Sequence, residues 1–292
     1  MNLRSFLFVP ADSDKKLARG AVAGADALIL DLEDSVTAPN KPQARAMARE
    51  FLGQRPRGQR RTPFWVRINA LSSGAALTDL AAIMPGGPDG IVLPKAEGVA
   101  DAARLSHYLD AFEVQHGLPA QSIRILPIAT ETAGAVFRLG EYASHRLPRL
   151  LGLTWGAEDL ATALGALGNR GADGQWSTAF RTSRALCLMA ARAADLQAVE
   201  TVFVDFRDSE GLRTASRMAR HEGFTGRLAI HPDQVPIINE CFVPSKEEVE
   251  RARRIIAAFA QSPNAGTVSI DGLMYDIPHL TQARRTVEVA GG

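Results

Sequence analysis

The sequence predicts an α/β fold, a (β/α)8 TIM barrel followed by a C-terminal helical extension and a lid segment. Three observations support this fold class. Short apolar runs alternate with longer amphipathic stretches over most of the 292 residues. Eight such runs can be counted, and eight parallel strands are the number that closes a barrel. After the eighth run about 60 residues remain, which is more than a barrel needs.

The predicted strands are runs of four to six residues rich in Val, Ile, Leu or Phe, as expected of strands buried on both faces. In chain order they are Ser5–Val9, Ala27–Leu30, Phe64–Ile68, Gly90–Leu93, Ile123–Ile128, Leu150–Leu153, Thr201–Val204 and Arg227–Ile230. The helical patterns between them include Asp14–Ala23, Lys41–Phe51, Val99–His116 and Ser209–His221. We therefore expect one barrel domain over residues 1–243.

Residues 244–292 are predicted to form a C-terminal helix and a lid or oligomerisation segment. Ser245-Lys246-Glu247-Glu248 is a capping box, and apolar residues follow it at helical spacing. Pro263-Asn264-Ala265-Gly266 then breaks the chain. The segment Val268–Asp276 resembles a short hairpin or covering segment rather than a barrel element.

Composition and charge exclude several classes of function. Lys and Arg number 33 and Asp and Glu number 32, so no bulk charge draws the chain to nucleic acid or to a membrane surface. No run of 18 apolar residues occurs, which excludes a transmembrane helix. Cys187 and Cys241 are far apart in apolar contexts, so neither a disulfide scaffold nor a zinc cluster is expected. The first residues contain no signal-peptide apolar region, and the expected compartment is the cytoplasm.

Polar side chains follow almost every predicted strand, where a barrel enzyme builds its site. They are Asp31, Glu33, Asp34, Arg67, Asn69, Lys95, Glu131, Glu158, Asp159, Asp205, Asp208 and His231. Several carboxylates at one mouth repel one another unless a cation joins them, and two carboxylates with open positions suit Mg²⁺ or Mn²⁺. The alternative is that these acids cap helices or pair with rim cations, which is the preferred interpretation for Asp205 and Asp208. His231 is interpreted as a structural, hydrogen-bonding residue.

Seven motifs carry a resemblance that covers nearly the whole chain. They are Arg4-Ser5-x-Leu7-Phe8-Val9-Pro10, Asp31-Leu32-Glu33-Asp34-Ser35-Val36 with Lys41 and Ala44-Arg45, Arg67-Ile68-Asn69, Leu93-Pro94-Lys95, Glu131-Thr132, Gly156-Ala157-Glu158-Asp159-Leu160 and Ile230-His231-Pro232-x-Gln234. In this order they resemble the citrate lyase β-subunit-like family, one of the metal-dependent acyl-CoA lyases and pyruvate-type aldolases on (β/α)8 barrels. Its members cleave or form a carbon–carbon bond between a 2-oxo acid and a thioester-activated acetyl or propionyl unit.

The resemblance implies a role for each matching residue. Glu131 and Asp159 would be the protein ligands of Mg²⁺, and Arg67 would hold the thioester or enolate oxygen. The backbone of Gly156, Ala157 and Glu158 would offer N–H groups to the substrate carboxylate at a helix N-terminus. Glu33 and Asp34 would bind metal waters or brace Lys41.

The coenzyme A side of the predicted site departs from the family pattern. Phe8 and Arg19 are counted among the substrate-binding residues, Phe8 because it belongs to the first motif. The family's Gly-Asp-Arg-Pro stretch reads Ala11-Asp12-Ser13-Asp14 here, so an arginine used on the coenzyme A phosphates is replaced by Ser13. The lysine six residues further on is Arg19, which keeps the charge. The thioester carrier, coenzyme A or a carrier protein, therefore stays open.

The resemblance also implies a mechanism and an assembly. A 3-hydroxyacyl thioester breaks into a 2-oxo acid and a thioester enolate, and the enolate then takes a proton from a general acid. In the family this acid is an aspartate supplied by a neighbouring subunit, and Asp276 in Gly272-Leu273-Met274-Tyr275-Asp276 matches it. A closed homo-oligomer, a trimer, is the expected active unit.

Several other functions have sequence signatures that can be compared with this chain. A Schiff-base aldolase would use Lys95, but strands five to eight hold no lysine. Neither a Gly-x-Ser-x-Gly elbow nor a nucleotide-binding glycine motif occurs. A thioesterase for a malyl-type thioester, a subunit of a larger lyase complex and an inactive metabolite-binding relative remain alternatives. The sequence does not choose among malyl, citramalyl, methylmalyl and citryl thioesters, because such differences are worth only about 1–3 kcal/mol.

Overall fold

The computed structural model describes residues 3–291, so Met1, Asn2 and Gly292 of the predicted domain ranges lie outside it. Eight parallel strands form one sheet in the hydrogen-bonded order β5-β4-β3-β2-β1-β8-β7-β6. They are β1 (Ser5–Pro10), β2 (Ala27–Asp31), β3 (Phe64–Arg67), β4 (Gly90–Leu93), β5 (Arg124–Pro127), β6 (Gly152–Thr154), β7 (Gln197–Glu200) and β8 (Gly226–Ala229).

The sheet closes on itself between β5 and β6 through two isolated parallel bridges, Ile125 with Leu150 and Ile128 with Thr154. The Ala129 N–H also donates to the Thr154 carbonyl at 2.8 Å. This seam has fewer pairs than the ladder between β1 and β2, where five residue pairs are in register. The predicted (β/α)8 barrel is confirmed, and isolated bridges rather than a continuous ladder close it between β5 and β6.

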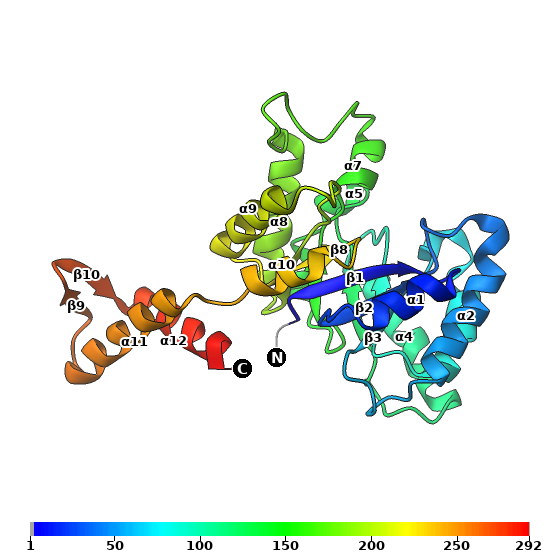
Figure 1. The fold of residues 1–292 in the computed structure, drawn as a ribbon, viewed down its shortest axis with the longest axis horizontal. Helices are drawn as coiled ribbons and strands as arrows, with labels where there is room; N and C mark the ends of the chain where they lie inside the picture. The colour runs from blue at the N-terminus through cyan, green and yellow to red at the C-terminus, as the bar shows by residue number, and fades with distance from the viewer. Residues whose placement is uncertain (1–2, 292) are drawn as a thin grey trace.

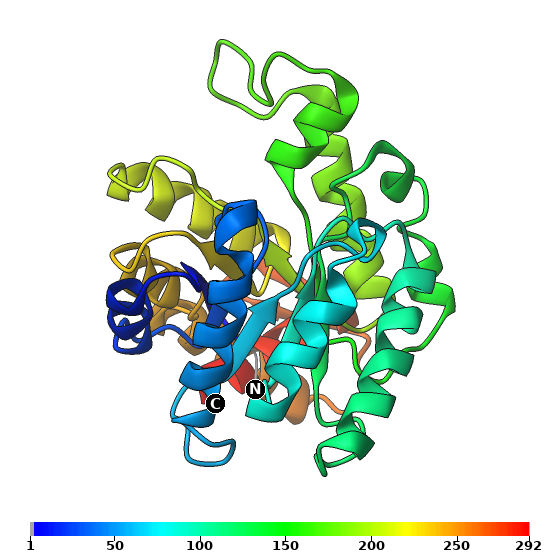
Figure 2. The same cartoon turned by 90° about the vertical axis from the view of Figure 1, so that its right-hand side faces the viewer.

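Helices surround the sheet on the outside of the barrel, as Figures 1 and 2 show. They are α1 (Asp14–Ala21), α2 (Lys41–Gly53), α3 (Ala76–Ile83), α4 (Val99–Gln115), α5 (Ala133–Val136), α6 (Glu141–Ser144), α7 (Ala157–Leu164), α8 (Thr178–Ala193), α9 (Ser209–Glu222) and α10 (Gln234–Cys241). The four predicted barrel helices are confirmed to within two residues at each end. Among residues 3–291, no helix is both long and apolar enough to cross a membrane.

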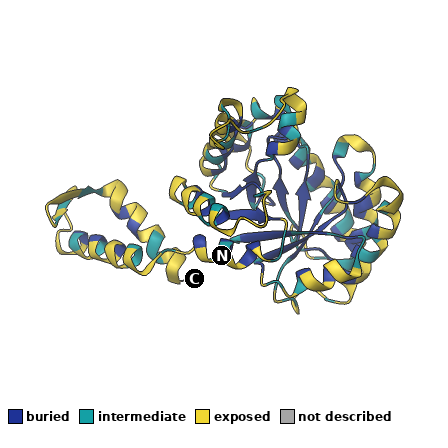
Figure 3. Cartoon of the chain, turned by 45° about the horizontal axis from the view of Figure 1, so that its top comes forward, coloured by how far each residue is buried: buried dark blue, intermediate teal, exposed yellow. Residues whose placement is uncertain are grey.

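The strands are buried on both faces because their side chains alternate between two cores. Phe6, Ile29 and Trp65 point into the barrel interior and pack together. The neighbouring residues Leu7 and Leu28 belong to the larger core between the sheet and the helices. Figure 3 shows the resulting pattern, a dark, buried sheet inside helices that are exposed on one face.

The seventh strand lies four residues earlier than the sequence predicts. The prediction of Thr201–Val204 is wrong, because β7 spans Gln197–Glu200. The error arises because both ends of the true strand are polar, although Gln197 and Glu200 are buried. Their hydrogen bonds satisfy them: Gln197 Nε2 donates to Thr225 Oγ1, and Glu200 accepts from three donors. The last residue of β7 is therefore the buried Glu200.

The remaining elements form a C-terminal arm, which we define as residues 246–291. It consists of α11 (Lys246–Gln261), the antiparallel strands β9 (Thr267–Ile270) and β10 (Leu273–Asp276), and α12 (Ile277–Gly291). The capping box at Ser245 and the hairpin are both confirmed. Buried residues of α11 and α12 form a separate small core, and Figure 1 shows the arm extending away from the barrel. The domain boundary at 243/244 stays a prediction, and it falls between α10 and α11.

Candidate active site at the barrel mouth

A buried ion pair joins the ends of β2 and β3. The Nε and Nη2 atoms of Arg67 donate to the two carboxylate oxygens of Asp31, each at 2.6 Å. Burial alone would raise the pKa of Asp31, but the charge and hydrogen bonds of Arg67 hold it below its usual value. Burial opposes the charge of Arg67, yet Asp31 and Glu33 raise the pKa of the guanidinium above its usual value. Arg67 is therefore a fixed cation, with N–H groups left over for a ligand.

Lys95 joins carboxylates from two other loops at the same mouth. Its Nζ atom pairs with Glu33, and it lies 3.0 Å from Asp34 Oδ2 and 3.3 Å from Asp159 Oδ1. Burial would lower the pKa of Lys95, but its hydrogen bonds with Glu33 and Asp34 raise it above the usual value. A charged amine is not a nucleophile, so these contacts argue against the Schiff-base alternative.

The predicted partner of Glu33 and Asp34 is corrected by these contacts. Their carboxylates brace Lys95, and Glu33 also approaches Arg67 Nη1 at 2.9 Å. Lys41, the expected partner, donates instead to the backbone carbonyls of Leu32 and Glu33 at 2.8 and 2.9 Å. The reason is geometric: the three acceptors within hydrogen-bond distance of the Lys41 amine are these two carbonyls and Asn69 Oδ1, which lies at 2.7 Å.

Glu131 is the most perturbed carboxyl of the mouth. It follows β5, is 4% exposed, and its Oε2 atom accepts from the Lys95 backbone N–H at 2.5 Å. Burial first, and then the neighbouring charge of Asp159, raise the pKa of Glu131 to about 8. A buried carboxylate beside another carboxylate is a group that a cation would stabilise.

The turn before α7 packs directly against Glu131. Gly156 is the N-cap of α7, and a Cβ atom there would lie 2.7 Å from Glu131 Cγ, so only glycine allows this approach. The Gly156 N–H donates to Thr130 Oγ1 at 3.1 Å. Ala157 and Glu158 begin the helix, and Asp159 lies in its first turn. Gly156 thus lies against Glu131, and Glu131 and Asp159 both contact Lys95, through its backbone N–H and its amine.

The predicted coenzyme A residues are spread more widely. The Phe8 ring lies under the Arg67 guanidinium, 4.7 Å from its carbon to the ring centroid, so Phe8 belongs to the mouth. Arg19 has a side chain that is 58% exposed and pairs with Asp233 at 3.3 Å. Ser13 caps α1 by accepting from the Lys16 N–H at 3.4 Å. The structure does not bring Arg19 or Ser13 into contact with the mouth cluster.

Asp276 is the predicted site residue that lies away from the others. It ends β10 in the C-terminal arm, and its side chain is paired with His279 of α12 at 2.5 Å. The hydrogen bond from His279 lowers the pKa of Asp276. Within one chain, Asp276 therefore neither reaches the mouth nor has the raised pKa of a proton donor.

The remaining strand-end residues have structural partners. Asp208 caps α9 by accepting from the Gly211 N–H at 2.8 Å, and Asp205 accepts from the Arg207 N–H at 3.1 Å. The His231 ring stacks on Phe206, with centroids 4.9 Å apart. These contacts agree with the capping and structural interpretations of the three residues.

Sequence reasoning missed two residues next to the site. Glu200 was hidden by the misplaced seventh strand, and Trp155 lies between the sixth predicted strand and the Gly156 motif. The Trp155 indole N–H donates to Glu200 Oε1 at 2.5 Å, and both side chains are buried. The only available signal was the position of Trp155 directly before Gly156.

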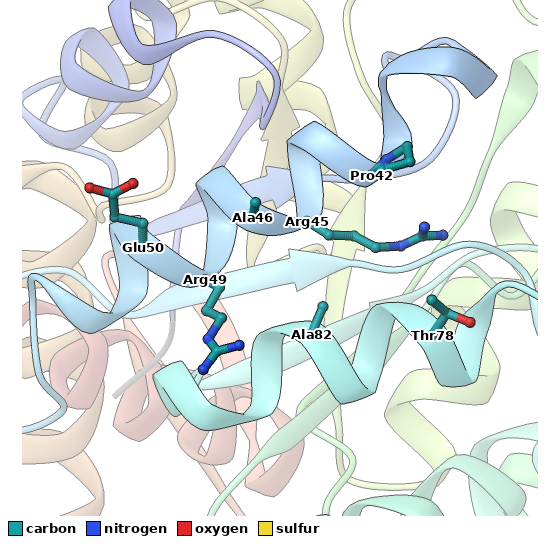
Figure 4. Close-up of a pocket in the computed structure, with 7 residues that line it drawn as sticks. All are labelled: Pro42, Arg45, Ala46, Arg49, Glu50, Thr78 and Ala82. Carbon is teal, nitrogen blue, oxygen red and sulfur yellow. The ribbon is translucent and has the colours of Figure 1, made fainter.

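A separate surface groove lies between α2 and α3, and Figure 4 shows the side chains that line it. Its lining consists of Pro42, Arg45, Ala46, Arg49, Glu50, Thr78 and Ala82. Arg45 is already paired with the buried Asp79 at 2.6 Å. The groove shares no residue with the site described above.

The charge balance at the mouth tests whether a divalent cation fits. Five carboxylates contact two cationic residues there. The cationic residues are Arg67 and Lys95, and the carboxylates are those of Asp31, Glu33, Asp34, Glu131 and Asp159. Within residues 3–291, no three His, Cys, Asp or Glu side chains are grouped as a complete metal cage. Mg²⁺ uses one or two protein carboxylates together with water and substrate oxygens, so the pair Glu131 and Asp159 fits this ion.

The fold and the site together define a class, a (β/α)8 barrel protein with an ion-paired acidic mouth around a glycine turn. The HpcH/HpaI aldolase/citrate lyase family model matches residues 4–232. The chain belongs to this family, which confirms the resemblance drawn from its motifs.

Two relatives and one solved structure extend the match over the whole chain. The citrate lyase subunit beta-like protein of Mycobacterium tuberculosis is 35% identical over 295 residues, 100% of this chain and 98% of the relative. The (3S)-malyl-CoA thioesterase of Cereibacter sphaeroides is 34% identical over 289 residues, 98% of this chain and 94% of the relative. The structure of CitE from Mycobacterium tuberculosis in complex with magnesium, acetoacetate and coenzyme A matches with a TM-score of 0.81 and 34% identity, covering 100% of this chain and 99% of that one.

Proposed function

We propose that this chain is a Mg²⁺-dependent carbon–carbon lyase for 3-hydroxy-dicarboxylyl-CoA thioesters of the malyl, citramalyl or citryl type. The observation that carries the proposal is the buried Glu131, with its raised pKa, beside Asp159 and within one mouth with Arg67. The relative crystallised with magnesium, acetoacetate and coenzyme A supports the same ligand classes here. Mn²⁺ is an alternative ion for the same oxygen ligands.

The reaction balances without an outside oxidant or reductant. In the cleavage direction, the substrate hydroxyl loses its proton and its oxygen becomes the carbonyl of a 2-oxo acid. The bond between the hydroxyl-bearing carbon and the carbon next to the thioester breaks, and its electron pair becomes the thioester enolate. The enolate carbon then takes a proton, which balances the one lost from the hydroxyl, and yields an acetyl or propionyl thioester. Bond formation is the reverse.

Each protein group has a task that follows from its surroundings. Arg67 is held by Asp31 and stacked on Phe8, so it presents fixed positive charge to the enolate oxygen. The N–H groups of Ala157 and Glu158 at the start of α7 bind the carboxylate of the 2-oxo acid, while the Gly156 N–H stays bound to Thr130 and holds the turn. Glu131 and Asp159 would hold Mg²⁺, which when bound polarises the oxygens of the 2-oxo acid as a Lewis acid.

Glu33 and Asp34 act through Lys95. Their carboxylates hold the side-chain amine of Lys95. The backbone N–H of the same residue donates to Glu131. We place the coenzyme A moiety toward Arg19, whose exposed guanidinium suits a phosphate. We propose the cytoplasm as the compartment, which remains the expectation from the sequence.

Asp276 is proposed as the proton donor to the enolate carbon, acting on the mouth of a neighbouring copy. It must lie within about 3 Å of that carbon or reach it through one water, and in its own chain it lies on the arm, paired with His279. The active unit would then be a closed homo-oligomer, and a trimer is proposed.

A thioesterase acting on a malyl-type thioester is the second candidate, and the relative named (3S)-malyl-CoA thioesterase favours it. Water would then attack the thioester carbonyl, and free coenzyme A would leave. A third candidate is a subunit of a citrate lyase complex that acts on a carrier-protein thioester. It is supported by the relative named a citrate lyase subunit beta-like protein.

One assay separates the first two candidates. Purified protein with Mg²⁺ is incubated with malyl-, citramalyl-, methylmalyl- and citryl-CoA, and the 2-oxo acid and the free thiol are measured separately. A lyase yields 2-oxo acid and acetyl or propionyl thioester in equal amounts without free thiol. Free thiol with no 2-oxo acid would contradict the lyase activity and support the thioesterase activity. Turnover in excess chelator would contradict the metal dependence.

A further inference from the structure

The start of α7 is held in place by side chains that the proposed reaction does not use. β6 has only three residues, Gly152–Thr154, and it joins β5 through two isolated bridges. On its other side β6 pairs with β7 through Thr154, and the next two residues are Trp155 and Gly156. The strand pairing therefore ends just before the candidate carboxylate-binding turn, and the turn itself depends on side-chain contacts.

Trp155 connects the turn to β7. Its side chain is fully buried, and its indole N–H donates to Glu200 Oε1 at 2.5 Å. A buried indole N–H requires a partner, because an unmade hydrogen bond in the interior is costly. The bond therefore fixes the ring, and with it the backbone one residue before Gly156.

Glu200 cannot follow a displaced ring, because its own position is fixed. Its Oε1 atom also accepts from the Thr201 N–H at 2.8 Å, and its Oε2 atom accepts from Arg184 Nε at 2.7 Å. Arg184 belongs to α8 and pairs as well with Glu222 of α9. The carboxylate is thus held by three donors from three directions.

On its other side the turn contacts the metal-binding position. The Gly156 N–H is bound to Thr130, and the Gly156 Cα lies against the Glu131 side chain. A shift of the turn would therefore move both the N–H groups at the start of α7 and the Glu131 carboxylate.

We propose that Glu200 and Trp155 are positioning residues that hold the Gly156 turn, and through it Glu131, in the geometry that binds the 2-oxo acid. The proposal rests on the proposed function for the identity of the ligand. The proposal depends on the hydrogen bond between these two side chains, because this bond links the end of β7 to the Gly156 turn.

Trp155→Phe is the main test, because it keeps an aromatic ring and removes the N–H donor. Trp65→Phe is the matched control: Trp65 is also buried, and its indole N–H has no hydrogen-bond partner among residues 3–291. Both variants lose similar volume from the core. Only the first loses a hydrogen bond.

Two measurements are made on both variants, hydrogen exchange at the Ala129 and Gly156 amides and calorimetric binding of pyruvate with Mg²⁺. In Trp155→Phe we expect exchange at both amides to accelerate by about tenfold, as for the loss of one hydrogen bond. We expect pyruvate affinity to fall by about 10- to 100-fold, the usual effect of losing an outer hydrogen-bond partner. Trp65→Phe should change neither quantity, although its melting temperature falls.

Unchanged exchange in Trp155→Phe, or equal acceleration in Trp65→Phe, overturns the proposal. Accelerated exchange with unchanged pyruvate affinity also overturns it, because the turn then does not position the acid site. If the unaltered protein binds none of pyruvate, glyoxylate and oxaloacetate with Mg²⁺, the proposed function fails, whereas the exchange comparison still decides whether Trp155 holds the turn. Glu200→Gln is the second variant, for use if Trp155→Phe does not fold. It should accelerate exchange less, since an amide oxygen can still accept from the indole, and unchanged exchange there is again a contradiction.

Discussion

The barrel mouth and the C-terminal arm place their candidate catalytic groups in opposite environments. At the mouth, residues from different strand ends surround Glu131, which is 4% exposed. On the arm, apolar side chains stay in solvent, and Met274 is 68% exposed. The mouth is assembled within one chain. The arm has a small core of its own and leaves apolar side chains such as Leu273 and Met274 exposed to solvent. Apolar surface of this kind marks interaction sites.

Two carboxyls make the contrast concrete. Burial raises the pKa of Glu131 to about 8, and a hydrogen bond from His279 lowers the pKa of Asp276. Glu131 already has the environment of a metal ligand. Asp276 gains the environment of a proton donor only if another surface covers it and replaces the His279 contact.

The largest expected effect is on the mouth. Glu131→Gln keeps the shape of the side chain but removes its charge, and we expect activity to fall by about a thousandfold or more because the metal is lost. Binding of Mn²⁺, followed by electron paramagnetic resonance, should weaken in parallel, while the circular dichroism spectrum stays unchanged. Full activity in this variant would remove Glu131 from the site.

The next effect tests whether the arm acts in another copy. Asp276→Ala alone should lose about 10²- to 10⁴-fold in activity, as expected for a general acid. Mixed with Glu131→Gln after subunit exchange, it should regain part of the activity, since some sites then combine an intact mouth with an intact arm. The oligomeric state is measured by light scattering. Verified exchange without recovery, or a monomer at assay concentration, would contradict a shared site.

A smaller effect is expected for the fixed cation of the mouth. Arg67→Lys keeps the charge but cannot bond both oxygens of Asp31 and also face the enolate, so activity should fall by about a hundredfold. Steady-state kinetics should show the loss in kcat. As a control on the arm, Arg254→Lys alters only an exposed pair with Asp271 and should leave kcat unchanged. Near-normal kinetics for Arg67→Lys would exclude Arg67 from the reaction.

The smallest effect concerns the stability of the metal-free protein. The folded-state pKa of Glu131 is raised, so the stabilisation it provides is complete below its usual pKa and is lost as pH rises toward 8. We expect the free energy of unfolding to fall between pH 5 and 8 by on the order of 1 to 3 kcal/mol. Urea unfolding in chelator measures this slope.

Matched variants sharpen the stability measurement. Glu131→Gln should flatten the slope, and Mg²⁺ should oppose the loss near pH 8 by binding the charged carboxylate. Asp271→Asn on the exposed arm, where Asp271 pairs with Arg254, should leave the slope unchanged. A slope that persists in Glu131→Gln would show that another group causes it.

Most of the fold could be predicted because apolar periodicity and capping residues are local signals. Ser245 and Glu248 form the predicted capping box, and the hairpin closes at Asp271 and Gly272, which both have positive φ angles. The seventh strand could not be predicted in this way. Its polar end residue Glu200 is buried with Trp155, which follows β6, and Arg184 of α8 as partners, and such partners cannot be seen in a local stretch of sequence.

The sequence by itself determined the barrel, the family and the residue types at the strand ends, because these depend on short-range patterns and ordered motifs. Only the tertiary structure decided which side chains pair. Lys95 rather than Lys41 meets the carboxylates of Glu33 and Asp34, and Trp155 is bound to Glu200. The physical reason is that an ion pair or a buried hydrogen bond depends on distances of about 3 Å between residues far apart in the chain, and those distances exist only once the barrel has closed.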